Sequence, residues 1–336
     1  MKQSVASEPI SAKRSPSKQR LRDSMSRLGM LPVLLIVSIV LFQFENSRFL
    51  AGENVLNILQ QSIYLILISI GQMLVLVSGG FDLSVGATVA LTSVVSSTVM
   101  VKLGVVMPDS PIIAAFAGFG SAMGVGLVVG LANGIGVSFM RVNPFIVTLA
   151  TSSVIQGLTL LISQGSEVGP LPDSFVSFVG SGMATGIPIA ALLALPAIGV
   201  IYLLVDWARY GRNLFAIGSN PKAAFVSGVR VNVSLAGTYV LCSLLTAFSS
   251  FMLTARVSSG QPLLGAEFPL SSITAAVIGG CSLKGGQGGL VGTILGALFV
   301  TMMSNGMDLV RLGSNYQMII LGVVLVVAVL LDRNRR

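Results

Sequence analysis

Long apolar runs separated by short polar segments are the feature that most restricts how this chain can fold. Most of the runs reach the roughly 20 residues that a helix needs to cross about 30 Å of hydrocarbon. The eighth run is short and passes directly into a glycine-rich turn, so we expect a partly unwound or re-entrant element there. We predict an all-α integral membrane protein with about ten transmembrane helices. The ten runs cover residues 28–44, 55–78, 84–102, 111–139, 144–164, 187–205, 233–255, 269–283, 288–307 and 314–331.

Composition excludes most soluble enzymes. Only 10% of the residues are charged, whereas an average soluble domain carries roughly 25%. The chain contains no histidine, which removes His-based zinc sites and Ser-His-Asp triads. It also has no G-x-x-x-x-G-K-[S/T] motif, so it does not bind ATP through a P-loop. We therefore predict no catalytic residue, metal or cofactor, and an integral-membrane enzyme is poorly supported.

The two cysteines, Cys242 and Cys281, lie in or beside apolar runs without CxxC spacing. A disulfide or a metal-binding pair is therefore not expected, and we assign both a structural role.

Basic residues predict the orientation in the membrane. If ten helices cross and both termini lie inside, 16 of the 20 Lys and Arg residues fall on the inner side. The outer four are Arg48, Lys102, Arg256 and Arg311. Such an excess marks the cytoplasmic side, so we place the N and C termini in the cytoplasm.

One transmembrane domain is expected over residues 28–332, between two cytoplasmic ends. Residues 1–27 are rich in Ser and basic residues and are predicted to form a disordered cytoplasmic tail. Residues 333–336 form the cytoplasmic end. The first run lacks a small-x-small site at its end, so it is interpreted as an uncleaved anchor.

Polar residues inside the apolar runs are almost all uncharged. No run of carboxylates crosses the membrane, so proton coupling lacks its usual residues, although sodium coupling through neutral oxygens stays open. Neutral hydrogen-bonding groups suit a neutral polyol or sugar, but they also serve as hydrogen bonds between helices. The candidate residues for the substrate path are Gln60, Asn133, Phe145, Thr148 and Gln156.

A glycine pattern, GGxxLxxG, occurs at residues 79–86 and again at 279–286. Paired glycines permit positive φ and close approach of helices, so the two copies predict related turns. Chance agreement in a chain with 38 glycines remains an alternative. The turn residues are Gly79, Gly80, Asp82, Gly86, Gly279, Gly280, Gly285 and Gly286.

Residues 206–232 form a polar segment on the predicted inner side. Asn220 and Pro221 suit the start of a short helix and Gly228 suits its end. Small Ala side chains and an exposed Phe225 would let this helix enter a groove on a partner. A solvated connector on the membrane surface is the alternative.

Four blocks resemble the permease subunits of bacterial ribose-type ABC sugar importers. They are GQMLVLVSGGFDLSVGATVAL at 71–91, NPFIVTLATSSVIQGLTLLISQG at 143–165, GRNLFAIGSNPKAAFVSGVRV at 211–231, and ITAAVIGGCSLKGGQGGLVGTILGALF at 273–299. The resemblance implies a permease of the bacterial inner membrane. Its implied partners are a second permease chain, two ATP-binding subunits and a periplasmic sugar-binding protein.

The same resemblance implies that 206–232 is the segment that couples the ATP-binding subunits to the membrane helices. Lys222 and Phe225 depart from the family pattern, which usually has an acidic residue at the first of these positions and Arg at the second. For Asp82 the resemblance implies that it fixes a turn. The implied coupling residues are Gly211, Arg212, Gly218, Asn220, Ala223, Ala224 and Gly228.

The expected cargo is a sugar, either a ribose-like pentose or a related monosaccharide. ABC permeases for nucleosides and branched amino acids share the architecture, so they remain alternatives. An ion-coupled secondary transporter that acts alone is a further alternative.

Overall fold

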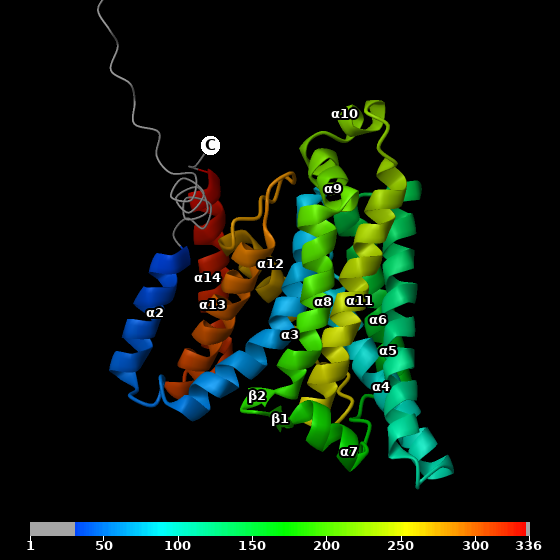
Figure 1. The fold of residues 1–336 in the computed structure, drawn as a ribbon, viewed down its shortest axis with the longest axis vertical. Coiled ribbons are helices and arrows are strands. Elements are labelled where there is room, and N and C mark those ends of the chain that lie inside the picture. The colour runs from blue at the N-terminus through cyan, green and yellow to red at the C-terminus, as the bar shows by residue number, and fades with distance from the viewer. Residues whose placement is uncertain (1–30, 334–336) are drawn as a thin grey trace, which may run out of the picture.

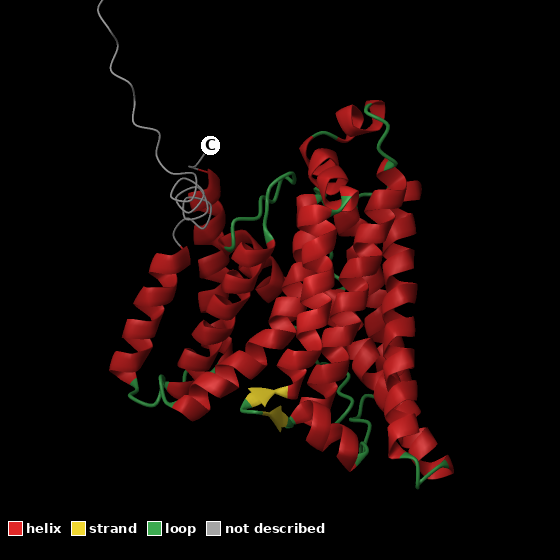
Figure 2. Cartoon of the chain, viewed as in Figure 1, coloured by secondary structure: helices red, strands yellow, loops and turns green. Residues whose placement is uncertain are grey.

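The structure, a computed structural model, describes residues 31–333, and the regular secondary structure of this part is helical apart from one short hairpin (Figure 2). The predicted tail over residues 1–27 and nearly all of the predicted 333–336 end lie outside the described residues. The first half contains α2 (Leu31–Glu45), α3 (Gly52–Val77), α4 (Val85–Val106), α5 (Pro111–Gly134), the π-helical turn η1 (Ile135–Phe139), α6 (Pro144–Ser163), α7 (Asp173–Phe175) and η2 (Val176–Gly180). The second half contains β1 (Met183–Ala184), β2 (Ile187–Pro188), α8 (Ile189–Tyr202), η3 (Leu203–Trp207), α9 (Arg209–Ser219), α10 (Pro221–Val226), α11 (Val231–Val257), α12 (Phe268–Ile278), α13 (Leu290–Leu309) and α14 (Ser314–Arg333).

Each of the ten predicted apolar runs carries a helix. Seven of the described helices are long and apolar enough to cross a membrane: α3, α4, α5 with η1, α6, α8 with η3, α11 and α13. Three shorter apolar helices cover Leu31–Glu45, Phe268–Ile278 and Ser314–Val327. The all-α membrane fold is therefore confirmed.

Helix α12 occupies only the first part of the predicted run at 269–283. It ends at Ile278, and the chain continues without regular structure to Gly289. Gly280, Gly285 and Gly286 adopt positive φ in this connection, a conformation that a right-handed helix cannot contain. The expectation of a short, interrupted element is met here.

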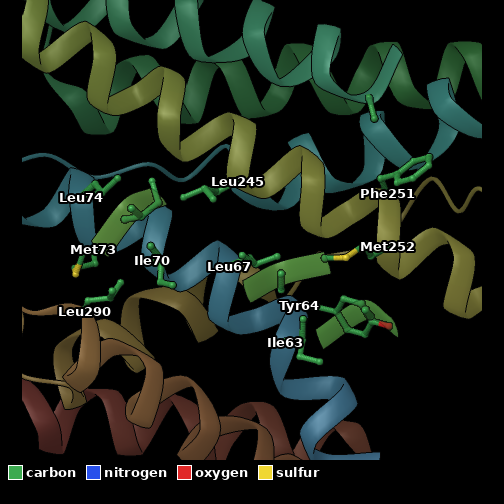
Figure 3. Close-up of a cluster of buried hydrophobic side chains, with 14 of the residues drawn as sticks. Ile63, Tyr64, Leu67, Ile70, Met73, Leu74, Leu245, Phe251, Met252 and Leu290 are labelled. Atoms are coloured by element: carbon green, nitrogen blue, oxygen red, sulfur yellow. The ribbon is translucent and has the colours of Figure 1, made fainter. Parts of the chain in front are cut away.

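Helix α3 lies at the centre of the molecule. Figure 1 shows α2, α12, α13 and α14 on one side of it and α4, α5, α6, α8 and α11 on the other. In Figure 3, α3, which carries Leu67 and Leu74, runs between α11, which carries Leu245, and α13, which carries Leu290. Seventeen residues of this helix are buried, so α3 forms the core that joins the two groups of helices.

Glycines bring α5 and α11 into close contact. A β-carbon added to Gly130 would lie 2.6 Å from Val240 Cα, and one added to Gly134 would lie 2.9 Å from the Ala236 carbonyl oxygen. Small residues at four-residue spacing are a common way for membrane helices to pack backbone to backbone. The abundance of glycine in this chain therefore reflects packing.

The two ends of the molecule differ. Figure 1 shows α9 and α10 at one end, together with the first described residues of α2 and the last turn of α14. The β1–β2 hairpin, in which Ala184 pairs with Ile187, and α7 lie at the opposite end.

Candidate functional site

The short helix predicted within residues 206–232 is present as α10. Asn220 caps it, because its Oδ1 accepts hydrogen bonds from the backbone N–H groups of Lys222 and Ala223, each at 3.1 Å. Pro221 occupies the first turn, and Gly228 beyond the end has φ +84°. Such side-chain caps stabilise a helix end by about 1 kcal/mol.

Sequence reasoning missed α9, which precedes α10. Its buried positions, Gly211, Leu214 and Ile217, follow a three-to-four-residue period that the sequence contains. This spacing is typical of an amphipathic helix. It does not form an apolar run, because Arg209, Arg212 and Asn213 lie between the apolar positions.

Helix α10 presents apolar side chains to solvent. Phe225 is 72% exposed and Val226 is 86% exposed. Ala223 is exposed as well, whereas Ala224 is buried within the chain, so only the first of the two alanines is free to touch a partner. Adjacent exposed apolar side chains on a polar segment are typical of a contact surface.

The end of α9 packs against the end of α3 and the α12–α13 connection. We call Gly79, Gly218, Gly285 and Gly286 the glycine junction. The backbone N–H of Gly286 donates to the Val77 carbonyl oxygen at 2.8 Å. A β-carbon added to Gly285 would lie 2.9 Å from both Gly79 Cα and the Gly218 carbonyl oxygen.

Gly218 is the most tightly enclosed member of this junction. A β-carbon on it would overlap the Val77 carbonyl oxygen and lie 2.6 Å from the Gly286 nitrogen. Any side chain at position 218 would push the three backbones apart. The structure thus brings both GGxxLxxG segments against the predicted coupling segment, which the sequence pattern alone did not predict.

The remaining turn and coupling residues lie outside the junction. A β-carbon on Gly80 would overlap Tyr239 Oη, and one on Gly279 would overlap the Gly292 carbonyl group. Arg212 donates from Nη1 to the Trp207 carbonyl oxygen at 3.2 Å, which ties α9 to the end of η3. Gly280 provides a left-handed turn after α12, with φ +94°.

Asp82 is fully buried in the turn between α3 and α4. Its Oδ1 accepts from the N–H of Ser84 at 2.9 Å and from Ser84 Oγ at 2.6 Å. Asn133 of α5 donates from Nδ2 to the same Ser84 Oγ at 2.8 Å. Burial raises the pKa of the Asp82 carboxyl above its usual range, and the hydrogen bonds from Ser84 oppose this rise. Asp82 therefore holds the turn and links it to α5.

The five candidate residues of the substrate path do not come together. Gln60 is buried and donates to the Gly180 carbonyl oxygen at 2.8 Å. Asn133 is buried as well, and its amide nitrogen donates to Ser84 in the Asp82 turn. Thr148 is buried and donates to the Pro144 carbonyl oxygen within α6. Phe145 is 51% exposed in the first turn of α6. Gln156 lines a cavity between α4, α6 and the segment before α12.

Both cysteines are buried and free of disulfides. The structural role expected for them fits this placement. Within residues 31–333 there is no cluster of three or more His, Cys, Asp or Glu side chains that could hold a metal ion.

Comparison with known proteins identifies similar membrane proteins. Residues 54–329 match the family described as branched-chain amino acid transport system / permease component. The ribose import permease protein of Bacillus subtilis (strain 168) is 38% identical over 309 residues, which is 92% of this chain and 92% of that protein. No solved structure matches this chain.

Two relatives from Escherichia coli (strain K12) carry different sugar names. Its ribose import permease protein is 33% identical over 340 residues, covering 99% of this chain and 100% of that protein. Its galactose/methyl galactoside import permease protein is 32% identical over 313 residues, covering 90% of this chain and 93% of that protein.

Proposed function

The chain belongs to the ribose-type sugar ABC-importer permease family, and we propose that it forms the path through which an assembled importer moves a monosaccharide across the bacterial inner membrane. The contact between the α9–α10 segment and the glycine junction supports this proposal most directly. It gives a partner bound at α10 a mechanical connection to α3 and to the α12–α13 connection.

The proposed topology has ten crossings, with both termini and the α9–α10 segment in the cytoplasm. In Figure 1 both ends of the described chain lie toward the same end of the molecule as α9 and α10, which supports this topology. The distribution of Lys and Arg supports the same orientation. In this topology α2, α12 and α14 complete the set of ten, with the irregular segments beside α12 supplying the length that this short helix lacks.

The energy for transport comes from separate ATP-binding subunits, because this chain has no P-loop of its own. We propose that the importer has two such subunits, and that one of them binds the exposed Phe225 and Val226 of α10 in this chain. Their closure would displace α9, and Gly218 would pass that displacement to the end of α3. A second permease chain and a periplasmic sugar-binding protein complete the proposed importer.

The test uses the complete importer reconstituted in vesicles, with the binding protein outside and ATP inside. The test sugars are D-ribose, D-galactose and D-allose, the last of which gives its name to a further permease relative from Escherichia coli (strain K12). Uptake of these sugars and, as an alternative cargo, of leucine is measured with and without the ATP-binding subunits. We expect ATP-dependent uptake of at least one of the three sugars. Uptake by the permease alone under a proton or sodium gradient would contradict the proposal and favour an ion-coupled transporter.

The docking role of α10 is tested in the same vesicles. We expect Phe225→Glu to reduce uptake about tenfold or more and to release the ATP-binding subunits during purification, because a desolvated carboxylate weakens an apolar contact by several kcal/mol. The matched control, Phe225→Leu, keeps an apolar side chain and should retain uptake. Normal uptake and co-purification of Phe225→Glu would contradict docking at α10.

A further inference from the structure

A non-helical segment, Ser258–Glu267, runs alongside a membrane-spanning helix. A β-carbon on Gly260 would lie 2.6 Å from Ser97 Oγ of α4. Further along, a β-carbon on Gly86 of the same helix would lie 2.7 Å from the Gly265 carbonyl oxygen. Ser97 and Gly86 are separated by about 16 Å along α4 at the usual helical rise, so the segment follows about half of that helix.

Irregular backbone at this depth requires a special environment. Its N–H and C=O groups are not paired within a helix, so such backbone occurs in membranes only where protein covers it or where it lines a space containing water. Helix α4 covers one side of Ser258–Glu267, and Ser93 Oγ accepts a hydrogen bond from the N–H of Gln261 at 3.3 Å. On another side the segment faces the cavity of about 370 Å³ that Gln156 also lines.

The wall that α6 contributes to this cavity is polar. Gln156 donates from Nε2 to the Pro262 carbonyl oxygen at 2.9 Å, which fixes the segment against α6. The Ser153 hydroxyl donates back to the Leu149 carbonyl oxygen at 3.2 Å, and the Ser152 hydroxyl has no hydrogen-bond partner among the described residues. Only 17% of the apolar stretch of α6 is buried within the chain. Polar groups on such a helix are unfavourable against lipid, and contact with water or a polar solute would satisfy them.

The side of the cavity opposite these polar groups is apolar, and two of the lining residues are glycines. Leu263, Leu264 and Pro269 contribute hydrocarbon, and Gly86 and Gly157 leave room. The described residues that line the cavity include no charged side chain. Hydroxyl and amide groups facing a hydrocarbon surface match a neutral sugar, which has a ring of hydroxyls and apolar C–H faces. The volume lies at the small end of the about 300–1,000 Å³ typical of ligand sites.

We propose that this cavity is a subsite that holds the monosaccharide during its passage, with Ser152, Ser153 and Gln156 as hydrogen-bonding groups. This assignment rests on the proposed function. Gln156 also has a positioning role, because its bond to Pro262 keeps the irregular segment open toward the cavity.

The first test fills the cavity. A β-carbon on Gly157 has no neighbour within 4 Å, so Gly157→Phe places a ring in the open space without displacing the backbone. The matched control is Gly120→Phe on α5, where the added group also meets nothing within 4 Å. In the complete importer we expect Gly157→Phe to reduce uptake of the transported sugar about tenfold or more. ATP hydrolysis and assembly should stay unchanged, and Gly120→Phe should behave like the parent.

Uptake by Gly157→Phe at the parent level would overturn the subsite while leaving the proposed function in place. Absence of any sugar uptake by the parent importer would instead refute the proposed function. The two failures are therefore distinguishable within one set of vesicles.

The second test measures water access without transport. Cys242 and Cys281 are buried, so an introduced cysteine is the accessible thiol among the described residues. We expect Ser153→Cys to react with a charged methanethiosulfonate about tenfold faster than Leu158→Cys on the other face of α6, because only a hydrated thiol ionises. Millimolar D-ribose, D-allose or D-galactose, whichever is transported, should slow the reaction at position 153. Equal and slow labelling at both positions, or no protection by the transported sugar, would overturn the proposal.

Discussion

At the scale of the residue, the carboxyl of Asp82 is the most constrained titratable group in the connections between helices. One oxygen accepts two hydrogen bonds from Ser84, while Oδ2 has no partner among the described residues. The Oδ1 of Asn133, on the neighbouring α5, is also buried without a partner. Burial of this carboxyl raises its pKa and favours its protonated form.

This protonation predicts the effect of pH on stability. Because burial raises the folded-state pKa of Asp82, its contribution to stability is complete below the usual aspartate value and is lost as pH rises through the folded pKa. We expect Asp82→Asn, which mimics the neutral acid, to reduce this loss of thermal stability at high pH. Unfolding of the parent and the variant in detergent over a pH series measures the difference.

The control for that comparison is Asp82→Ala. It leaves the Ser84 donors without their acceptor, so it should be less stable than Asp82→Asn by about 1–3 kcal/mol at every pH, because neither variant titrates at this position. An Asp82→Asn protein with the same pH dependence as the parent would show that Asp82 is ionised in the folded protein.

At the scale of the element, three chain segments meet without side chains between them. The ends of α3 and α9 and the α12–α13 connection approach through Gly79, Gly218, Gly285 and Gly286. Direct contact of backbones leaves little freedom for one segment to move without the others. Displacement of α9 therefore reaches the end of α3, the most buried of the seven long apolar helices among the described residues.

Gly218→Ala tests this contact. The added methyl group overlaps the Val77 carbonyl oxygen, and overpacking of this kind typically costs about 1–3 kcal/mol. We expect a lower unfolding temperature and weaker coupling of ATP hydrolysis to uptake. Gly199→Ala in α8 is the control, since its added methyl has no neighbour within 4 Å. Gly218→Ala with the parent's stability and coupling would contradict a tight junction.

At the scale of the whole molecule, the helices differ widely in how much of their surface the chain itself covers. The apolar stretch of α3 is 78% buried, whereas those of α6, α8 and α5 are 17%, 22% and 28% buried. Apolar surface left exposed to this extent is expected where lipid or a second permease chain covers a helix. The molecule is thus built around α3, with α5, α6 and α8 at its periphery.

The topology of the whole molecule is tested by labelling from each side. Thr185 in the β1–β2 turn and Ser227 after α10 are both exposed and lie at opposite ends. We expect Thr185→Cys to react with an impermeant thiol reagent in spheroplasts, and Ser227→Cys to react only after the membrane is opened. The reverse result would invert the proposed orientation, and labelling of both in closed spheroplasts would exclude it.

The apolar runs by themselves determined the class of fold. A stretch of about 20 apolar residues has few stable arrangements other than a spanning helix, so each of the ten runs carries a helix in the structure. The start of α10 was equally predictable, because capping by Asn220 and Pro221 depends only on neighbours in sequence.

Only the tertiary structure decided which polar residues share a site. Gln60, Asn133 and Gln156 are all amide side chains within apolar runs of the sequence. In the structure Gln60 and Asn133 are buried and hydrogen-bonded to neighbouring segments, whereas Gln156 borders a cavity. The same holds for Gly79, Gly218 and Gly285, which lie far apart along the chain and meet in one junction. Local sequence fixes the length and the ends of a helix through interactions within a few residues. Which side chains meet depends on how helices pack, and packing is set by contacts between segments that no local pattern contains.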